Sequence, residues 1–163
     1  MTYIIEKMND THGPGIITIF NHYIQTTFSA YFEDPLPEAF FGRLVEIIKD
    51  HPAFVVKTDE GQLVGFAFIR AYNAATSFRH TADLTYFNHP DHTRKGIGTL
   101  MLEKLIEDAK SRGIQNVIAS IASKNEGSIN FHKKHGFEEK GRLTNVGKKF
   151  GQYFDVIYMQ RSI

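Results

Sequence analysis

The sequence predicts an α/β domain built on a mixed sheet, and the order of its elements is the main reason. Two helical segments and a hairpin come early, and a strand–helix–strand–helix–strand succession follows them. The chain has 163 residues, of which 42% are hydrophobic and 23% are charged, as in an ordinary globular protein. Because this length suits one domain with an adequate core, we expect a single domain over residues 1–163.

The composition argues against several classes of function. The formal net charge is +1 and no long run carries one sign, so we expect no binding to nucleic acid or to a membrane surface. Cysteine is absent, which excludes thiol catalysis, disulfides and cysteine-based zinc sites. The N-terminal residues MTYIIEKMNDTHG lack the pattern of a secretory signal, and no apolar stretch is long enough to span a bilayer. We therefore expect a cytoplasmic protein.

The first half of the chain predicts two helices and three strands. Asn9 or Asp10 can cap a helix that runs through Ile24, and Pro37 suits the first turn of a second helix. A hairpin then turns around residues 59–61. The expected elements are a strand at 3–6, a helix from 9 or 10 to 24, a helix at 38–50, and strands at 54–58 and 63–71.

Residues 80–112 organise the second half, as a strand, a basic glycine turn and an amphipathic helix. Ile97, Met101, Leu105 and Ala109 recur at helical spacing after the turn. Downstream, the segment NVIASIA is apolar on both faces and predicts an interior strand. The remaining expected elements are this strand at 116–122, a helix at 126–135 between a cap at Asn125 and a stop at Gly136, and strands at 137–142 and 154–161.

The glycine turn predicts an anion site. Gly96 and Gly98 stand where the helix begins, and the first backbone N–H groups of a helix lack intrahelical partners and carry partial positive charge. Arg94 and Lys95 add positive charge, which favours a phosphate or pyrophosphate. Two common nucleotide-binding motifs do not match this turn. A P-loop needs its lysine after the last glycine, but here Lys95 precedes the glycines. A dinucleotide-binding fingerprint needs a third glycine, but Met101 stands in that position. The alternative is a glycine-rich turn with a solvated basic edge.

These features resemble the GNAT superfamily of N-acetyltransferases over nearly the whole chain. The superfamily's signature, Gln/Arg-x-x-Gly-x-Gly/Ala, is matched by Lys95-Gly96-Ile97-Gly98, although its first position is Thr93 here. Asn125 opens a helix that ends in Gly136-Phe137, as in the second signature. The segment GRLTNVGKKFGQYFDVIYMQR resembles the phosphinothricin and methionine-sulfoximine acetyltransferase branch. The resemblance implies the GNAT fold, a central mixed and mostly antiparallel sheet of six to seven strands flanked by about four helices.

The resemblance also implies the reaction and its cosubstrate, acetyl-CoA. The expected enzyme transfers an acetyl group directly to the primary amine of a small, amino-acid-like acceptor of the phosphinothricin or methionine sulfoximine type. Backbone amides of the glycine turn would hold the pyrophosphate, and the main chain at the end of the central strand would contact pantetheine. The implied cofactor-binding residues are Phe87, Asn88, His89, Arg94, Lys95, Gly96, Ile97, Gly98, Thr99 and Asn125.

Two residues are candidates for acid–base chemistry. Asp83 lies on the central strand where this branch usually has a glutamate, which takes the amine proton, often through water. The alternative is a structural carboxylate that pairs with Arg79 or His80. His132 stands where the superfamily often uses a tyrosine to protonate the leaving thiolate, and histidine can donate a proton near neutral pH. Its alternative is packing beside Ile129 or a hydrogen bond to the cosubstrate.

The acceptor pocket is expected from three aromatic segments, 26–32, 72–78 and 148–154. The alternative is that most of these rings belong to the core or to a dimer interface. Two departures weaken the case for phosphinothricin itself, since Ala75 replaces the usual arginine and Tyr153 replaces the usual tryptophan. The candidate substrate-binding residues are Phe28, Phe32, Tyr72, Phe78, Lys149, Phe150 and Tyr153.

Two further expectations concern metal binding and assembly. Neither the His89–His92 pair nor the His132–His135 pair has an obvious third ligand, so we expect no metal. The resemblance implies a homodimer. Two other functions stay open: a non-catalytic module that binds acyl-CoA, and an N-acetyltransferase that acts on a protein N-terminus.

Overall fold

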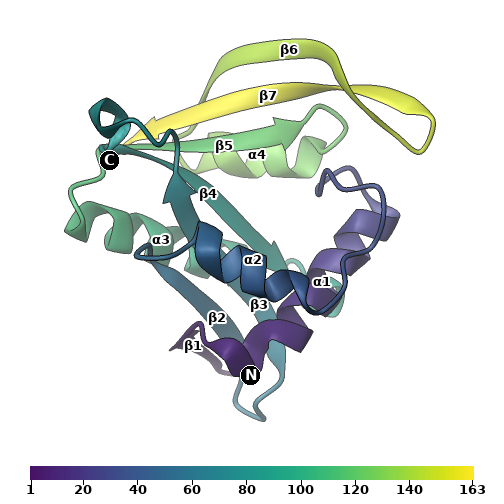
Figure 1. Ribbon diagram of the computed structural model, residues 1–163, viewed down its shortest axis with the longest axis vertical. Coiled ribbons are helices and arrows are strands. Elements are labelled where there is room, and N and C mark those ends of the chain that lie inside the picture. Colours follow the sequence, from purple (N-terminus) through teal and green to yellow (C-terminus); the bar gives the residue numbers. More distant parts are fainter.

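A seven-stranded mixed sheet forms the centre of the computed structural model, which describes residues 1–163 (Figure 1). Its spatial order is β1-β2-β3-β4-β5-β7-β6, and only the pair β4–β5 is parallel. The predicted sheet is confirmed. The strands are β1 Tyr3–Lys7, β2 Ala53–Thr58, β3 Leu63–Ala71, β4 Thr81–Asn88, β5 Asn116–Ala122, β6 Glu138–Lys149 and β7 Gln152–Ser162.

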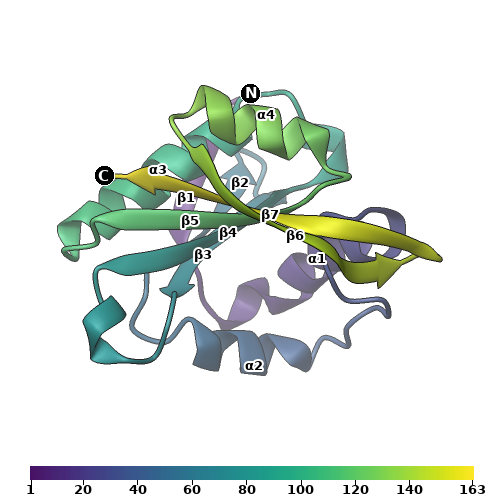
Figure 2. The ribbon, with the colours of Figure 1, turned by 90° about the horizontal axis from the view of Figure 1, so that it is seen from above.

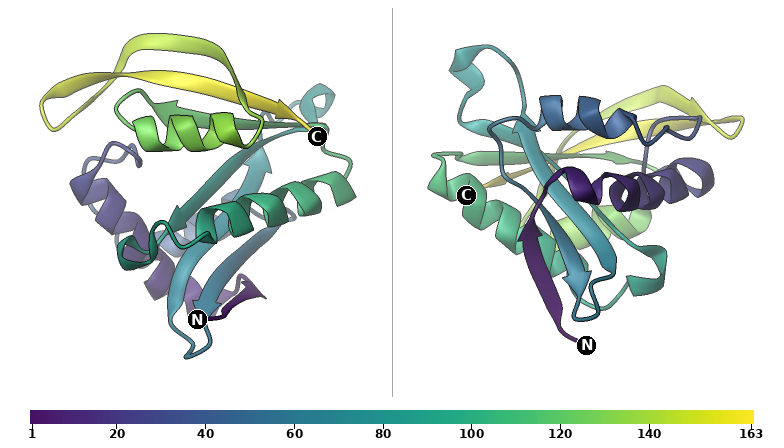
Figure 3. Two further views of the ribbon diagram at one scale, coloured as in Figure 1. Left: turned by 180° about the vertical axis from the view of Figure 1, so that it is seen from behind. Right: turned by 60° about the horizontal axis from the view of Figure 1, so that its bottom comes forward.

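Four α-helices cover the two faces of this sheet. Helices α1 (Gly13–Thr26) and α2 (Phe40–Ile47) lie on one face, and α3 (Ile97–Ser111) and α4 (Glu126–Lys134) lie on the other (Figures 2 and 3). The larger core, of 19 buried residues, fills the space between the sheet and α3. A second core of 9 buried residues lies under α1 and α2. No helix is long and apolar enough to cross a membrane.

Helix α3 follows the predicted periodicity closely. Its buried residues recur three or four positions apart, as a helix with one apolar face requires. Gly96, the N-cap residue just before the helix, has a left-handed φ of 83°, a conformation that glycine adopts without steric cost. The buried residues of α3 are Ile97, Met101, Leu102, Leu105, Ile106 and Ala109.

The two central strands separate part of the way along their length. β4 pairs with β5 only from Thr81 to Asp83. Beyond Asp83, β4 continues along β3 to Asn88, whereas β5 continues along β7 to Ala122. Figure 1 shows the two strands diverging from this shared segment. We call the opening between them the splay, and it positions the candidate site described below.

The C-terminal hairpin is longer than the sequence predicts. Strand β6 extends to Lys149 rather than to residue 142, and β7 starts at Gln152. Only Phe150 and Gly151 connect them, both with positive φ (52° and 72°), as in a type I′ hairpin turn. The sequence predicts a turn over GKKFGQ, but most of that segment belongs to the strands. The β6–β7 register shifts between Leu143 and Gly147, and such an irregularity removes the alternation that would have identified a strand there. Helix α2 is shorter than the predicted helix at 38–50.

Candidate active site

The splay opens at the carboxyl ends of the only parallel strand pair. Helix α3 follows β4 after a short connection, and α4 follows β5 after Ser123–Asn125. Both helices therefore begin beside the same opening, on one face of the sheet (Figure 3). Such crevices outside the carboxyl ends of parallel strands are where α/β proteins bind ligands.

The start of α3 offers free backbone donors. No side chain caps this end, and the first backbone bond within the helix runs from the N–H of Leu100 to the carbonyl of Gly96. Arg94 and Gly96 both have positive φ, at 59° and 83°, and Arg94 and Lys95 are exposed. Left-handed residues among successive amides form an anion-binding concavity. The arrangement therefore fits a pyrophosphate, as the sequence predicts.

Other residues of the predicted turn have additional contacts. Ile97 is fully buried in the larger core, so only its main chain can meet a ligand. The hydroxyl of Thr99 lies 3.3 Å from Nε2 of His135 on α4. A Cβ added at Gly98 would lie 3.6 Å from the ring of Phe131, so α4 packs closely over this turn of α3.

The end of β4 presents main-chain groups to the splay. The N–H of His89 donates to the carbonyl of Val64 on β3 at 2.7 Å. Because successive residues of a strand direct their N–H groups to opposite edges, the N–H of Asn88 faces away from β3 and toward the splay. The carbonyl of Asn88 accepts a 2.7 Å hydrogen bond from the hydroxyl of Tyr23 on α1, a residue that the sequence analysis missed.

Phe87 is a packing residue in this structure. Its ring centroid lies 5.3 Å from that of Phe20, 5.1 Å from that of Tyr23 and 5.6 Å from that of Phe66. Contact of Phe87 with the cosubstrate stays a prediction, and the ring is only partly buried.

Asp83 lies at the point where β4 and β5 part. Its partner is Arg70, which stands opposite it on β3, with Nε 3.6 Å from Oδ2 of the carboxylate. The alternative prediction, an ion pair of Asp83 with Arg79 or His80, is wrong. The Arg79 guanidinium donates to the carbonyl of Thr76 instead. Burial raises the pKa of Asp83, and the positive charge of Arg70 partly offsets that rise.

His132 is buried and both of its ring nitrogens have partners. Nδ1 lies 2.7 Å from the carbonyl of Ser128 one turn earlier in α4, and Nε2 lies 2.7 Å from the hydroxyl of Tyr86 on β4. The ring also packs edge-on against Phe137, at 5.0 Å between centroids. Burial lowers the pKa of His132. Tyr86 was missed because nothing in the sequence shows that it faces α4.

Asn125 joins two parts of the site. Its Oδ1 accepts a bond from the N–H of Ser128 and so caps α4, as predicted. Its Nδ2 donates to Oγ of Ser29 at 3.0 Å. The side chain thereby holds the segment after α1 against the start of α4, and its contact with the cosubstrate stays a prediction.

The segment after α1 meets the C-terminal hairpin, as the predicted acceptor pocket requires. Phe28 makes edge contacts with Phe150 at 5.4 Å and with Phe154 at 5.6 Å. Tyr31 stacks on Phe154 at 5.8 Å, and its hydroxyl lies 3.1 Å from Oγ of Ser120 on β5. These rings form an aromatic wall beside β5.

The remaining candidate rings lie in separate groups. Tyr72 and Phe78 contact each other at 5.7 Å in the loop between β3 and β4. Phe32 packs against Phe20 and Phe40, on α1 and α2. Tyr153 is 59% exposed, with the ammonium of Lys148 5.0 Å from its ring centroid.

Lys149 occupies a structural position. It is only 2% exposed, and its ammonium donates to the carbonyls of Thr27 and Ala30, both at 2.7 Å. Burial lowers the pKa of Lys149. In this structure the side chain ties the hairpin to the segment after α1, so its predicted contact with substrate would need these bonds to change.

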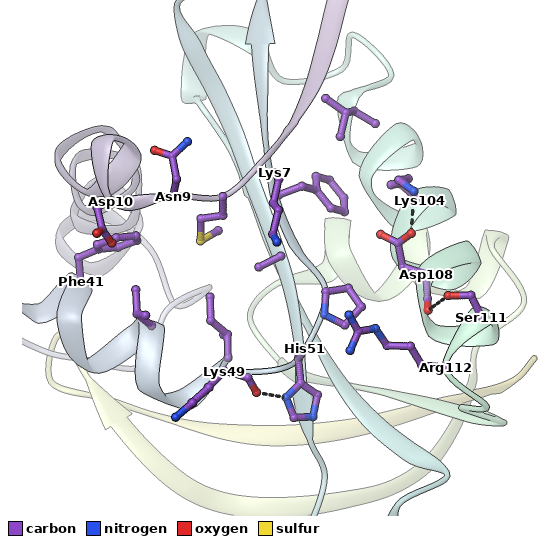
Figure 4. Close-up of a pocket in the computed structure, with 17 residues that line it drawn as sticks. Lys7, Asn9, Asp10, Phe41, Lys49, His51, Lys104, Asp108, Ser111 and Arg112 are labelled. Carbon is purple, nitrogen blue, oxygen red and sulfur yellow. Dashed lines mark hydrogen bonds and ion pairs between the residues drawn. The ribbon is translucent and has the colours of Figure 1, made fainter.

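A cleft of about 620 Å³ lies away from the splay, between the end of β1, helix α2 and the C-terminal part of α3 (Figure 4). Several of its polar and charged groups already have partners within the protein. Lys104 pairs with Asp108 at 2.6 Å, Arg112 donates to the carbonyl of Asp50, and Nδ1 of His51 lies 2.8 Å from the carbonyl of Lys49. None of the candidate catalytic, cofactor-binding or substrate-binding residues lines it.

Comparisons with known proteins agree with this geometry. A model of the acetyltransferase (GNAT) family matches residues 16–137. The L-methionine sulfoximine/L-methionine sulfone acetyltransferase of Pseudomonas aeruginosa is 30% identical over 154 residues, which cover 92% of this chain and 88% of that protein.

Two solved structures share the whole fold. A phosphinothricin acetyltransferase from Sinorhizobium meliloti, in complex with acetyl-CoA, superposes with a TM-score of 0.94 at 27% identity, over 100% of this chain and 89% of that one. A ribosomal-protein-alanine N-acetyltransferase from Brucella melitensis superposes with a TM-score of 0.91 at 30% identity, over 98% and 99% of the two chains.

Proposed function

The chain belongs to the acetyltransferase (GNAT) family, and we propose that it transfers the acetyl group of acetyl-CoA directly to the primary amine of a small, amino-acid-like acceptor. The observation that carries the proposal is the splay, with Asp83 where the strands part and the free amides of α3 at its mouth. The chain contains no cysteine, so a cysteine acyl-enzyme is excluded, and we propose that transfer is direct. Relatives named for methionine sulfoximine and phosphinothricin support the acceptor class.

The residues around the splay fit acetyl-CoA, which supplies an activated acetyl thioester. The amides at the start of α3, with Arg94 and Lys95, would hold the pyrophosphate. The N–H of Asn88 is available to pantetheine or to the thioester oxygen, whereas that of His89 is already bonded to β3. We therefore assign the oxyanion-stabilising N–H to Asn88 within the predicted set of residues 87–89.

Asp83 is the proposed general base. An amine attacks only as the neutral form, so a group near the thioester must accept its proton. A carboxylate whose pKa is raised by burial binds that proton more readily than an exposed one. Because aspartate is one methylene shorter than glutamate, we propose that a water relays the proton to Asp83.

The acceptor lies, in this proposal, on the face of the sheet that carries Asp83. The aromatic wall of Phe28, Tyr31, Phe150 and Phe154 stands on one side of the splay. The Tyr72–Phe78 pair stands at the connection that leads into β4. An apolar wall with a few polar groups suits a small ligand that carries one reactive amine.

Acetylation of a protein N-terminus is the second candidate activity, because one structural relative is named for a ribosomal protein. Thiol release from acetyl-CoA, measured against free amino acids, their sulfone, sulfoximine and phosphinate analogues, polyamines and an alanine-terminated peptide, separates the candidates. Release with an amino-acid analogue is the expected result. Release with the peptide alone would contradict the acceptor class, and a flat panel with clear acetyl-CoA binding would favour a non-catalytic binding module.

We also propose that the protein is a cytoplasmic homodimer. The C-terminal hairpin exposes several large apolar side chains, and β6 is an edge strand that pairs with β7 on one side only. A second copy of the chain could cover this surface. Acetyl-CoA is produced and consumed inside cells, which supports the location. The exposed apolar residues of the hairpin are Leu143, Val146, Phe150, Tyr153 and Tyr158.

A further inference from the structure

Tyr86 and His132 form a hydrogen-bonded pair that crosses the splay. Tyr86 belongs to β4, three residues beyond the last pairing with β5, and His132 belongs to the helix that follows β5. Their polar atoms are 2.7 Å apart, and the rings are 5.8 Å apart between centroids. The pair therefore links the two sides of the opening into which acetyl-CoA would insert.

The partners of His132 determine which atom carries its proton. The carbonyl of Ser128 can only accept, so Nδ1 of His132 carries a hydrogen and donates it at 2.7 Å. In the neutral ring, Nε2 is then an acceptor, and the hydroxyl of Tyr86 donates to it. The neutral His132 ring thus has no N–H directed into the splay. A proton that leaves Nε2 of the charged ring meets the oxygen of Tyr86 first.

Tyr86 and Asp83 lie on opposite faces of β4, because they are three residues apart in a strand. Asp83 shares its face with Arg70 and Phe87, toward α1 and α2, whereas Tyr86 packs against the core under α3 and α4. An acetyl group held in the splay would have the base on one side and the Tyr86 hydroxyl on the other.

We propose that the Tyr86 hydroxyl delivers the proton to the sulfur of CoA as the acetyl group leaves, with His132 as the group that orients and reprotonates it. The inference rests on the proposed acetyl transfer. The new S–H bond takes the hydrogen of the Tyr86 O–H. The step starts from the imidazolium form of His132, whose Nε2–H donates to the Tyr86 oxygen and leaves the Tyr86 O–H free for the sulfur. A new Tyr86 O–H bond takes the hydrogen of Nε2, and His132 becomes neutral imidazole and regains its proton from solvent. The tyrosine stays neutral throughout.

Replacement of Tyr86 by phenylalanine removes the hydroxyl and keeps the ring. We expect Tyr86→Phe to lower kcat about 100-fold, the usual effect of losing one acid–base group, while acetyl-CoA affinity changes little and the protein stays folded. Tyr3→Phe is the matched control, because Tyr3 also contacts a histidine, His92 at 3.5 Å, but on the strand at the far edge of the sheet. That variant should keep the native kcat.

A second measurement requires no acceptor and no turnover. The thiolate of bound CoA absorbs in the ultraviolet, so its fraction can be titrated on the native protein and on Tyr86→Phe. When His132 is protonated, its Nε2–H donates to the Tyr86 oxygen and the Tyr86 O–H is free to donate to the thiolate. Loss of that hydrogen bond should lower the thiolate fraction about tenfold at a pH where His132 is charged, the effect of one charge-assisted bond. Equal titrations in both proteins would overturn the inference alone. Failure of the native protein to bind CoA would overturn the proposed function as well.

A double-mutant cycle tests whether the two residues act in one chain. If the proton passes from His132 through Tyr86, the double variant Tyr86→Phe/His132→Asn should be no slower than the slower single variant. Independent losses that multiply would show that His132 acts without Tyr86. An undiminished kcat in Tyr86→Phe would likewise overturn the assignment, because the sulfur would then leave without this proton.

Discussion

The carboxylate of Asp83 lies in a mixed environment that governs when it can accept a proton. It is 23% exposed, and its single charged neighbour, Arg70, approaches to 3.6 Å from the adjacent strand. Burial raises the pKa of Asp83 and Arg70 opposes that rise, so the two influences compete at one carboxylate. Two substitutions separate the role of the carboxylate from the role of its neighbour.

Asp83→Asn should lower kcat by about 10²- to 10⁴-fold, as expected when a general base is lost. The amide keeps the size of the side chain, so acetyl-CoA affinity should stay within about threefold of native, because the cosubstrate contacts assigned here involve β4 main chain and α3. Steady-state kinetics and calorimetric titration measure the two quantities. Native kcat in this variant would contradict the assignment of Asp83 as the base.

Arg70→Gln should move the acidic limb of the kcat/KM profile to higher pH. The positive guanidinium stabilises the Asp83 carboxylate, so its removal raises the pKa of Asp83 further. The base works only when deprotonated, and activity is therefore lost earlier as the pH falls. Arg79→Gln is the control, since Arg79 contacts the carbonyl of Thr76 and not Asp83. A shift of the same size in both variants would contradict a specific Arg70–Asp83 interaction.

At the scale of elements, the segment after α1 is held in place by two side chains from distant parts of the chain. Asn125 donates to Ser29, and Lys149 donates to the carbonyls of Thr27 and Ala30. The segment has no regular secondary structure of its own over these residues. Its aromatic side chains can therefore form a wall only because α4 and the C-terminal hairpin fix its backbone.

Lys149→Met should reduce the free energy of unfolding by about 1–3 kcal/mol, because two backbone carbonyls lose their donor. Lys148→Met is the neighbouring control, since Lys148 is exposed and lies over the ring of Tyr153. Urea denaturation of the two variants gives the comparison. Equal stability of both variants would mean that the buried ammonium contributes nothing net.

Gly147→Ala should impair acceptor binding more than acetyl-CoA binding. A Cβ at Gly147 would overlap the ring of Phe154, so that ring must move, and the aromatic wall formed with Phe28 and Tyr31 moves with it. We expect KM for the acceptor to rise about tenfold or more, the effect of roughly 1.4 kcal/mol. Gly141→Ala on the same strand is the control, because a Cβ there meets nothing within 4 Å. A rise in KM for acetyl-CoA alone would contradict the proposed position of the acceptor.

At the scale of the whole molecule, the sequence predicted what depends on local patterns. The order of elements, the buried face of α3 and the cap at Asn125 follow from periodicity and capping preferences, and all three are confirmed. The contacts that tune the candidate site depend on strand register and helix packing. Arg70 faces Asp83 because of the β3–β4 register, and Tyr86 meets His132 across 46 residues. No periodicity within one element encodes such pairs.

The proposed dimer is the property that depends on the molecule as a whole. Val146 is 56% exposed and Leu143 is 48% exposed, on an edge strand with nothing beyond it. If a second copy covers this hairpin, Val146→Glu places a charge in an apolar interface and should convert the dimer to a monomer in light scattering after size exclusion. Ile47→Glu is the control, because Ile47 is 48% exposed on α2, on another element. Dissociation by both substitutions, or by Ile47→Glu alone, would place the interface elsewhere, whereas a monomeric native protein would contradict the dimer itself.

Because the same hairpin carries Phe150 and Phe154, a monomeric Val146→Glu should also show a raised KM for the acceptor, with acetyl-CoA affinity unchanged.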